Sequence, residues 1–185
     1  MKKSYIPWLV LAGLAAYVFI GWLALSSGSL GVQAQNGAVW NAITTGGEKL
    51  GRLEAQYNAG GIQLPKDLMK DLVEGRKALA AAKQSNDLDA AAAAVDKIQI
   101  NLTALSEASG ILDTTPALIS LMDETSEAFN KVGYERGKLI DVQKGYAMTR
   151  VIFFPISGLF PDYGILGSSA NPAQPMPTSQ FAPKD

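Results

Sequence analysis

The stretch "LISLMDETSEAFNKVGYERGKLIDVQKGYA", residues 118 to 147, decides the fold of this chain. Its apolar and semi-apolar residues recur at alternating spacings of three and four, the pattern of a helix that packs along one seam. Thr115 and Pro116 offer an N-cap and a proline at N1, so the pattern predicts one helix from Pro116 to about Phe153. Such a helix reaches about 55 Å and is typical of an elongated antiparallel bundle. The seam positions are Leu118, Leu121, Thr125, Ala128, Val132, Glu135, Leu139, Val142 and Tyr146.

Three helical segments precede this seam. The first is predicted over Glu48 to Tyr57, before the break "NAGGIQLP" at 58–65, and the second begins at Lys66. The third follows N-cap chemistry near Asn86 and carries its own seam. With no useful strand alternation, the sequence predicts an all-α fold with a helical bundle over 48–160. The apolar positions of the last two segments are Leu68, Leu72, Leu79 and Ala82, then Leu88, Ala91, Val95, Ile98, Leu102 and Leu105.

Two glycines interrupt the long last helix. Gly133 and Gly137 lie one turn apart, where they either let a neighbouring helix approach closely or mark local fraying or a kink. The residues themselves do not decide between these interpretations.

The N-terminal residues form an apolar segment of membrane-spanning length. Residues 4 to 47 carry no charge, and Tyr5 to Leu25 is almost continuously apolar, which predicts a transmembrane anchor over 1–27. Residues 28–47 contain Gly and Ser and are interpreted as a neck or a weak first helix. Lys2 and Lys3 precede the span, so the positive-inside rule puts the N-terminus in the cytoplasm and the soluble domain outside. The predicted anchor residues are Tyr5, Trp8, Trp22 and Leu25.

A cleaved signal peptide is the alternative for the same segment. The small-residue sequence "VQA" at 32–34 would then be the cleavage site. Against it, the apolar run is longer than the 7 to 15 residues of a usual signal-peptide core.

Composition narrows the chemistry available. The 185 residues include no Cys and no His, which removes thiolate nucleophiles, imidazole bases and nearly every transition-metal site. The 16 basic and 17 acidic residues nearly cancel, so nucleic acid is not an expected partner. The carboxylates Asp123, Glu124 and Glu127 are interpreted as a solvated helix face. We therefore expect no enzyme activity, no cofactor, no metal and no catalytic residue.

Serine chemistry is the remaining catalytic alternative. Ser106, Ser109 and Ser120 share the chain with several lysines, so an envelope hydrolase that uses Ser and Lys is a minor hypothesis.

The run "VIFFPISGLF", residues 151 to 160, is apolar but too short to span a bilayer. It either folds back as a cap on the core or contacts the membrane interface or a partner, and we favour the second. The contact residues would be Phe153, Phe154, Leu159 and Phe160. Residues 161–185 hold five of the nine prolines and are predicted to be a disordered tail.

Residues 121–147 also resemble the last long helix of the LemA family of membrane-anchored bacterial proteins. Thr149-Arg150, Phe154-Pro155 and Gly158-Leu159-Phe160 are similar to later family elements, with about three residues missing between the last two. "AVWNA" at 38–42 and "VEGRKA" at 73–78 extend the resemblance upstream, and "GRLEAQYNAGG" at 51–61 departs from the family's first soluble helix. The resemblance implies one anchor and an antiparallel bundle, with no catalytic residues to carry over. The matching positions are Leu121, Asp123, Glu124, Asn130, Arg136 and Tyr146.

These observations lead to one hypothesis and one rival. The expected protein is a single-pass, membrane-anchored helical scaffold of the bacterial cell envelope, in contact with the lipid bilayer and other envelope proteins. Small residues in the span, Gly13, Ala16 and Gly21, suggest self-association as a homo-oligomer. The rival is a cleaved periplasmic or secreted bundle that binds a small apolar ligand between its helices.

Overall fold

The computed structural model describes residues 6–59, 64–109 and 116–167 of the chain. In these residues every regular element is helical, as the spacing of apolar residues predicted. The elements are α1 (Ile6–Asn58), α2 (Lys66–Ser85), α3 (Leu88–Ser109), α4 (Pro116–Ile152) and the short 3-10 helix η1 (Ile156–Leu159). The sequence patterns therefore located α2, α3 and α4 almost to the residue. The call on Thr115 as an N-cap lies outside the described residues.

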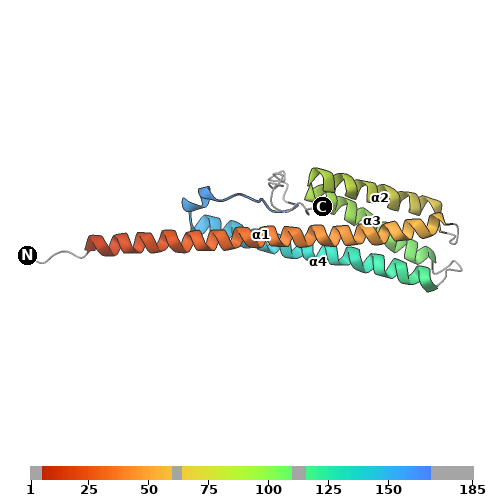
Figure 1. Cartoon of the computed structure of the whole chain (residues 1–185), viewed down its shortest axis with the longest axis horizontal. Coiled ribbons are helices and arrows are strands. Elements are labelled where there is room, and N and C mark those ends of the chain that lie inside the picture. Colours follow the sequence, from red (N-terminus) through yellow and green to blue (C-terminus); the bar gives the residue numbers. More distant parts are fainter. Residues whose placement is uncertain (1–5, 60–63, 110–115, 168–185) are drawn as a thin grey trace, which may run out of the picture.

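α1 differs from its prediction. Residues 28–47, interpreted as a neck or a weak helix, are part of one unbroken α-helix of 53 residues. At 1.5 Å per residue this helix is about 80 Å long. It projects beyond the rest of the molecule at its N-terminal end (Figure 1).

The bundle is antiparallel and its halves are built differently. In the distal half (residues 39–58 and 64–139), α1 packs against α2 and α4, and α3 packs against α2 and α4, which closes a four-helix arrangement. In the proximal half (residues 21–38 and 140–167), α1 and α4 continue as a pair without α2 and α3, and the chain after η1 returns along them. We call that returning segment, residues 161–167, the strap.

The turn between α2 and α3 explains why both helices end where they do. Asn86 adopts a left-handed conformation with φ 53° and ψ 34°, and its N–H donates to carbonyls of the last turn of α2. Asp87 then caps α3, because its Oδ1 accepts a hydrogen bond of 2.9 Å from the N–H of Ala90. This is the capping chemistry that the sequence indicated.

The predicted seams form the core. All six seam positions of α3 are buried, and so are Leu118, Val132, Leu139 and Tyr146 of α4. α1 supplies a third seam that the sequence analysis missed, since its small and polar members had been interpreted as a neck. Its positions follow a strict alternation of four and three: Leu25, Ser29, Val32, Asn36, Val39, Ile43, Gly46, Leu50 and Leu53.

Glycines set the close contact between α1 and α4. A Cβ added to Gly46 would lie 3.0 Å from the ring of Phe129, and one added to Gly28 would lie 2.8 Å from the ring of Tyr146. Only glycine therefore leaves room for these rings. By contrast, a Cβ at Gly133 or Gly137 meets nothing within 4 Å, so neither admits a neighbouring helix.

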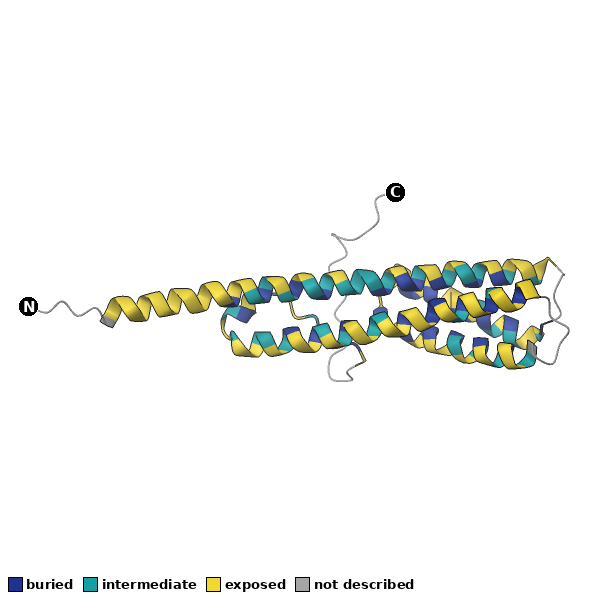
Figure 2. Cartoon of the chain, turned by 90° about the horizontal axis from the view of Figure 1, so that it is seen from below, coloured by how far each residue is buried: buried dark blue, intermediate teal, exposed yellow. Residues whose placement is uncertain are grey.

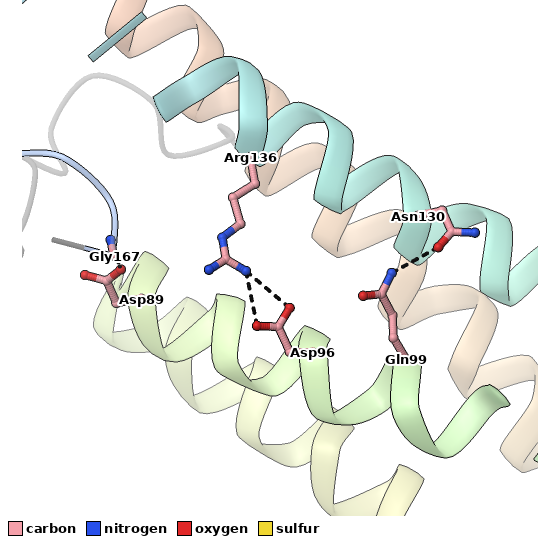
Figure 3. Close-up of polar contacts among 6 residues, drawn as sticks. All are labelled: Asp89, Asp96, Gln99, Asn130, Arg136 and Gly167. Atoms are coloured by element: carbon pink, nitrogen blue, oxygen red, sulfur yellow. Dashed lines mark hydrogen bonds and ion pairs between the residues drawn. The ribbon is translucent and has the colours of Figure 1, made fainter. Parts of the chain in front are cut away.

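Polar contacts fix α3 on α4 (Figure 3). Gln99 Nε2 donates to Asn130 Oδ1 at 3.1 Å, and Arg136 Nη1 contacts both carboxylate oxygens of Asp96 at 3.2 and 3.3 Å. The strap reaches the same helix, because the N–H of Gly167 donates to Asp89 Oδ1 at 3.0 Å.

Candidate membrane-contacting site

The N-terminal part of α1 is exposed on every side. Residues 7–20 are exposed throughout, and this end of the helix is uniformly yellow in Figure 2. α1 is the one helix in the described parts of the chain that is long and apolar enough to cross a membrane. An apolar surface of this size, with no protein against it, is the opposite of a soluble core helix.

The four predicted anchor residues fall into three environments. Trp8 and Trp22 are exposed, by 73% and 53%, at the two ends of the apolar segment. Leu25 is fully buried at 0% exposure and begins the α1 seam, so it faces protein. Tyr5 lies outside the described residues.

The end of α4 lies beside the last part of this apolar segment. The rings of Tyr17 and Phe153 are 5.4 Å apart between centroids, and a Cβ added to Gly21 would lie 2.6 Å from the ring of Phe153. Ile156 of η1 contacts Gly21 as well. Residues 152–156 therefore pack against the span at the level of Tyr17 to Gly21.

The outward face of this region is apolar. Phe154 and Leu159 are 76% and 82% exposed. With three neighbours they form what we call the proximal patch: Met148, Val151, Ile152, Phe154 and Leu159. A patch next to an exposed apolar helix marks a contact surface, since monomeric soluble proteins rarely leave such areas open.

The four predicted contact residues are thus divided between two roles. Phe154 and Leu159 point outward, whereas Phe153 and Phe160 are partly buried and pack on the core cluster. The two interpretations of "VIFFPISGLF", core cap and contact surface, apply to different residues of the same run. The Phe154–Pro155 peptide bond in this run is cis.

The strap is held by a polar network. The hydroxyls of Tyr163 and Ser29 lie 2.8 Å apart, and Gln33 Nε2 donates to Tyr163 Oη at 2.6 Å. Tyr146 Oη donates to the Pro161 carbonyl at 2.9 Å, and Gln143 Oε1 accepts from the Leu166 N–H at 3.0 Å. The predicted disordered tail at 161–185 is therefore wrong for its first part, which packs through Gly167. The rest, 168–185, lies outside the described residues.

Electrostatics at the strap follow from burial. Burial of its ring raises the pKa of Tyr146, Arg150 lowers it, and Tyr163 and Asp162 raise it further. Arg150 and Asp162 form an ion pair of 2.7 Å beside this ring.

The structure brings together no catalytic constellation among the residues it describes. These residues include no group of three or more His, Cys, Asp or Glu positioned to hold a metal ion. Asp123, Glu124 and Glu127 are exposed, as a solvated face requires. Ser120 lines a surface hollow between α1 and α4 with Arg52, Gln56 and Glu124, and the side chain of Ser109 is not among those described.

Two features of the site escaped the sequence analysis. The α1 seam was detectable, because Leu25, Val32, Val39, Gly46 and Leu53 follow one another at intervals of seven. The strap gave almost no signal, since Tyr163 and Leu166 are isolated apolar residues at the start of a Pro-rich segment.

Comparison of the chain with protein-family models, with curated proteins and with solved structures finds no match.

Proposed function

We propose that this chain is a single-pass, membrane-anchored helical scaffold of the bacterial cell envelope, LemA-like and without catalytic activity. The observation that carries the proposal is the continuity of α1. One helix contains an exposed apolar segment of about 20 residues and then, without a break, a seam buried in the bundle. A bundle attached in this way is displayed at a fixed distance and direction from the membrane.

The resemblance to the LemA family supports the same proposal through the roles of its residues. Asn130 and Arg136 make the polar contacts that join α4 to α3, and Tyr146 fills the space above Gly28. The residues that carry the resemblance are therefore those that position α4. Asp123 and Glu124 are exposed and available to a partner.

The proposed topology follows from charge. Lys2 and Lys3 are the only charged residues before Glu48, so the N-terminus would be cytoplasmic and the bundle would lie outside. Other envelope proteins are the proposed partners of its exposed faces.

Self-association through the span is part of the proposal, with one change. Gly21 already contacts Phe153 and Ile156 of its own chain, whereas nothing lies within 4 Å of a Cβ at Gly13. Gly13 and Ala16 are therefore the small residues left for a second copy. Sedimentation of the detergent-extracted protein as a monomer over a wide concentration range would contradict this part.

The proposal is tested by the mass and topology of the mature protein. Because the chain has no Cys, Ser4→Cys and Tyr134→Cys each introduce one thiol. We expect an intact mass that includes the N-terminal segment, resistance to carbonate extraction, and labelling of Tyr134→Cys alone by an impermeant maleimide on whole cells with a permeable outer layer.

Two outcomes would overturn the proposal. A mature chain that lacks the first 34 residues would favour the cleaved, secreted rival. Labelling of Ser4→Cys in place of Tyr134→Cys would reverse the topology.

A further inference from the structure

We propose that residues 151–161 form a second membrane-embedded element, a re-entrant tip that enters the same leaflet as the C-terminal half of the span. This inference rests on the proposed function, because it requires α1 to cross a bilayer. It assigns the proximal patch to lipid.

Depth is the first argument. α1 is fixed as a ruler by its rise of 1.5 Å per residue, so Ile6 to Leu25 covers the roughly 30 Å of a hydrocarbon core. The tip contacts α1 at Tyr17 and Gly21. Tyr17 is eight residues before Leu25, which places the lowest part of the tip about 12 Å inside the hydrocarbon.

Charge is the second argument. Residues 151–161 contain no charged side chain, and a charged residue stands at each end: Arg150 before them and Asp162 after them. These two residues pair at 2.7 Å, so the tip leaves and re-enters the bundle through one closed ion pair. Such a pair fits the membrane surface, where charge is still solvated, with only apolar chain below it.

Backbone hydrogen bonding is the third argument, because irregular chain in hydrocarbon must satisfy its polar groups internally. The N–H groups of Phe153, Ser157, Gly158 and Phe160 all donate to carbonyls within 149–157. Pro155 and Pro161 have no N–H to satisfy.

The span itself supplies the remaining hydrogen-bond partner. Tyr17 Oη lies 3.0 Å from the Ile152 carbonyl and 3.3 Å from the Phe154 carbonyl, at the point where α4 ends. A hydroxyl in the middle of an apolar segment thus serves the two carbonyls that the end of the helix leaves open.

Continuity of surface identifies lipid as the occupant. Phe154 and Leu159 are exposed at the same level as Val18, Phe19 and Trp22 of the span, which are exposed too. Acyl chains that surround these span residues would therefore also reach the tip.

Fluorescent labelling in vesicles tests the inference. The full chain carries one cysteine at a time, Phe154→Cys or Leu159→Cys, each labelled with the environment-sensitive dye NBD. The vesicles contain phosphatidylcholine and phosphatidylglycerol, with a nitroxide on some of the acyl chains. Leu9→Cys in the exposed span is the positive control, and Tyr134→Cys, exposed in the distal half, is the negative control.

We expect NBD at 154 and 159 to show blue-shifted emission and to be quenched by the acyl-chain nitroxide as strongly as NBD at 9. NBD at 134 should show neither effect. Quenching at 9 without quenching at 154 and 159 would overturn the tip and leave the anchor intact. A blue shift at 154 without quenching would mean that protein, such as a second copy, covers the patch.

Failure of both proposals has a different signature. If NBD at 9 is not quenched, α1 does not enter the bilayer, and the proposed function fails together with the tip.

Discussion

The distal and proximal halves of the bundle solve the same packing problem with different residues. In the distal half, four helices surround large side chains such as Phe129, Leu53 and Leu105, all fully buried. In the proximal half only α1 and α4 remain, and the seam contains Ser29, with Asn36 at the end nearer the distal half. Two helices alone cannot enclose a seam, so the proximal half uses glycine–aromatic contacts and the strap.

The difference teaches how a bundle can be joined to a span without a flexible linker. The apolar distal core fixes the helices, whereas the hydrogen-bonded proximal half carries the same helices on toward the span. Side-chain hydrogen bonds also specify position more narrowly than apolar contacts do. If the two halves differ in this way, substitutions in them should differ in size and kind.

The largest effect is expected in the distal core. Phe129→Ala removes a fully buried ring that packs against Gly46, and should lower the free energy of unfolding by about 3–5 kcal/mol. Urea denaturation of the full chain in detergent measures it. Tyr134→Ala, at an exposed position of the same helix, should change stability by no more than about 0.5 kcal/mol. Equal losses for the two variants would contradict the distal core.

The next effect tests the glycine–aromatic contact of the proximal half. Gly28→Ala places a Cβ 2.8 Å from the buried ring of Tyr146 and should destabilise the protein by about 1–3 kcal/mol. Gly37→Ala is the matched control, because a Cβ there meets nothing within 4 Å. It should stabilise the helix by about 0.5–1 kcal/mol. A stabilising Gly28→Ala would show that α1 and α4 are farther apart than described.

A smaller effect is expected for the strap. Tyr163→Phe removes the hydroxyl that Ser29 and Gln33 share, and should cost about 1–2 kcal/mol because both partners are partly buried. Proteolysis near residue 161 should accelerate in the same variant, since the strap would open more often. Tyr134→Phe serves as the control. Unchanged proteolysis would show that the strap is held by other contacts.

The smallest effect is a dependence on pH. Because the pKa of Tyr146 is raised above its ordinary value of 10.0 by burial, the unfolded chain ionises there first as the pH increases. The contribution of Tyr146 to stability is therefore complete below pH 10.0 and is lost as the pH rises through the folded-state pKa. Tyr146→Phe should flatten this decline in unfolding free energy, whereas Tyr134→Phe should not. An unaltered decline in Tyr146→Phe would contradict the burial of the phenol.

The sequence predicted the distal half better than the proximal half, for a physical reason. In α3 and α4 the buried positions are nearly all apolar, so the spacing of Leu88 to Leu105 and of Leu118 to Tyr146 identified both seams. In α1 the seam includes Gly46 and Ser29, whose burial depends on Phe129 and Tyr163 far away in the chain. Local spacing cannot reveal a position whose value comes from its partner.

The same reason explains the result for the candidate site. The run "VIFFPISGLF" was recognised as a contact region, but its division into inward Phe153 and outward Phe154 depends on Tyr17 and Gly21. The strap could not have been foreseen, because its hydrogen bonds join residues more than a hundred positions apart.

The continuity of α1 from the apolar segment into the bundle is tested most directly by one distance. Spin labels at Leu14→Cys and Asn41→Cys, both exposed and 27 residues apart, bracket residues 28–37, where a neck had been predicted. In lipid nanodiscs, pulsed electron resonance should give a single narrow distribution near 40 Å, the length of an unbroken helix. Its width should match that of a pair at Ile119 and Met148, exposed on the continuous helix α4. A broad or much shorter distribution would mean that α1 bends between the two sites, and would contradict the rigid connection on which the proposed function depends.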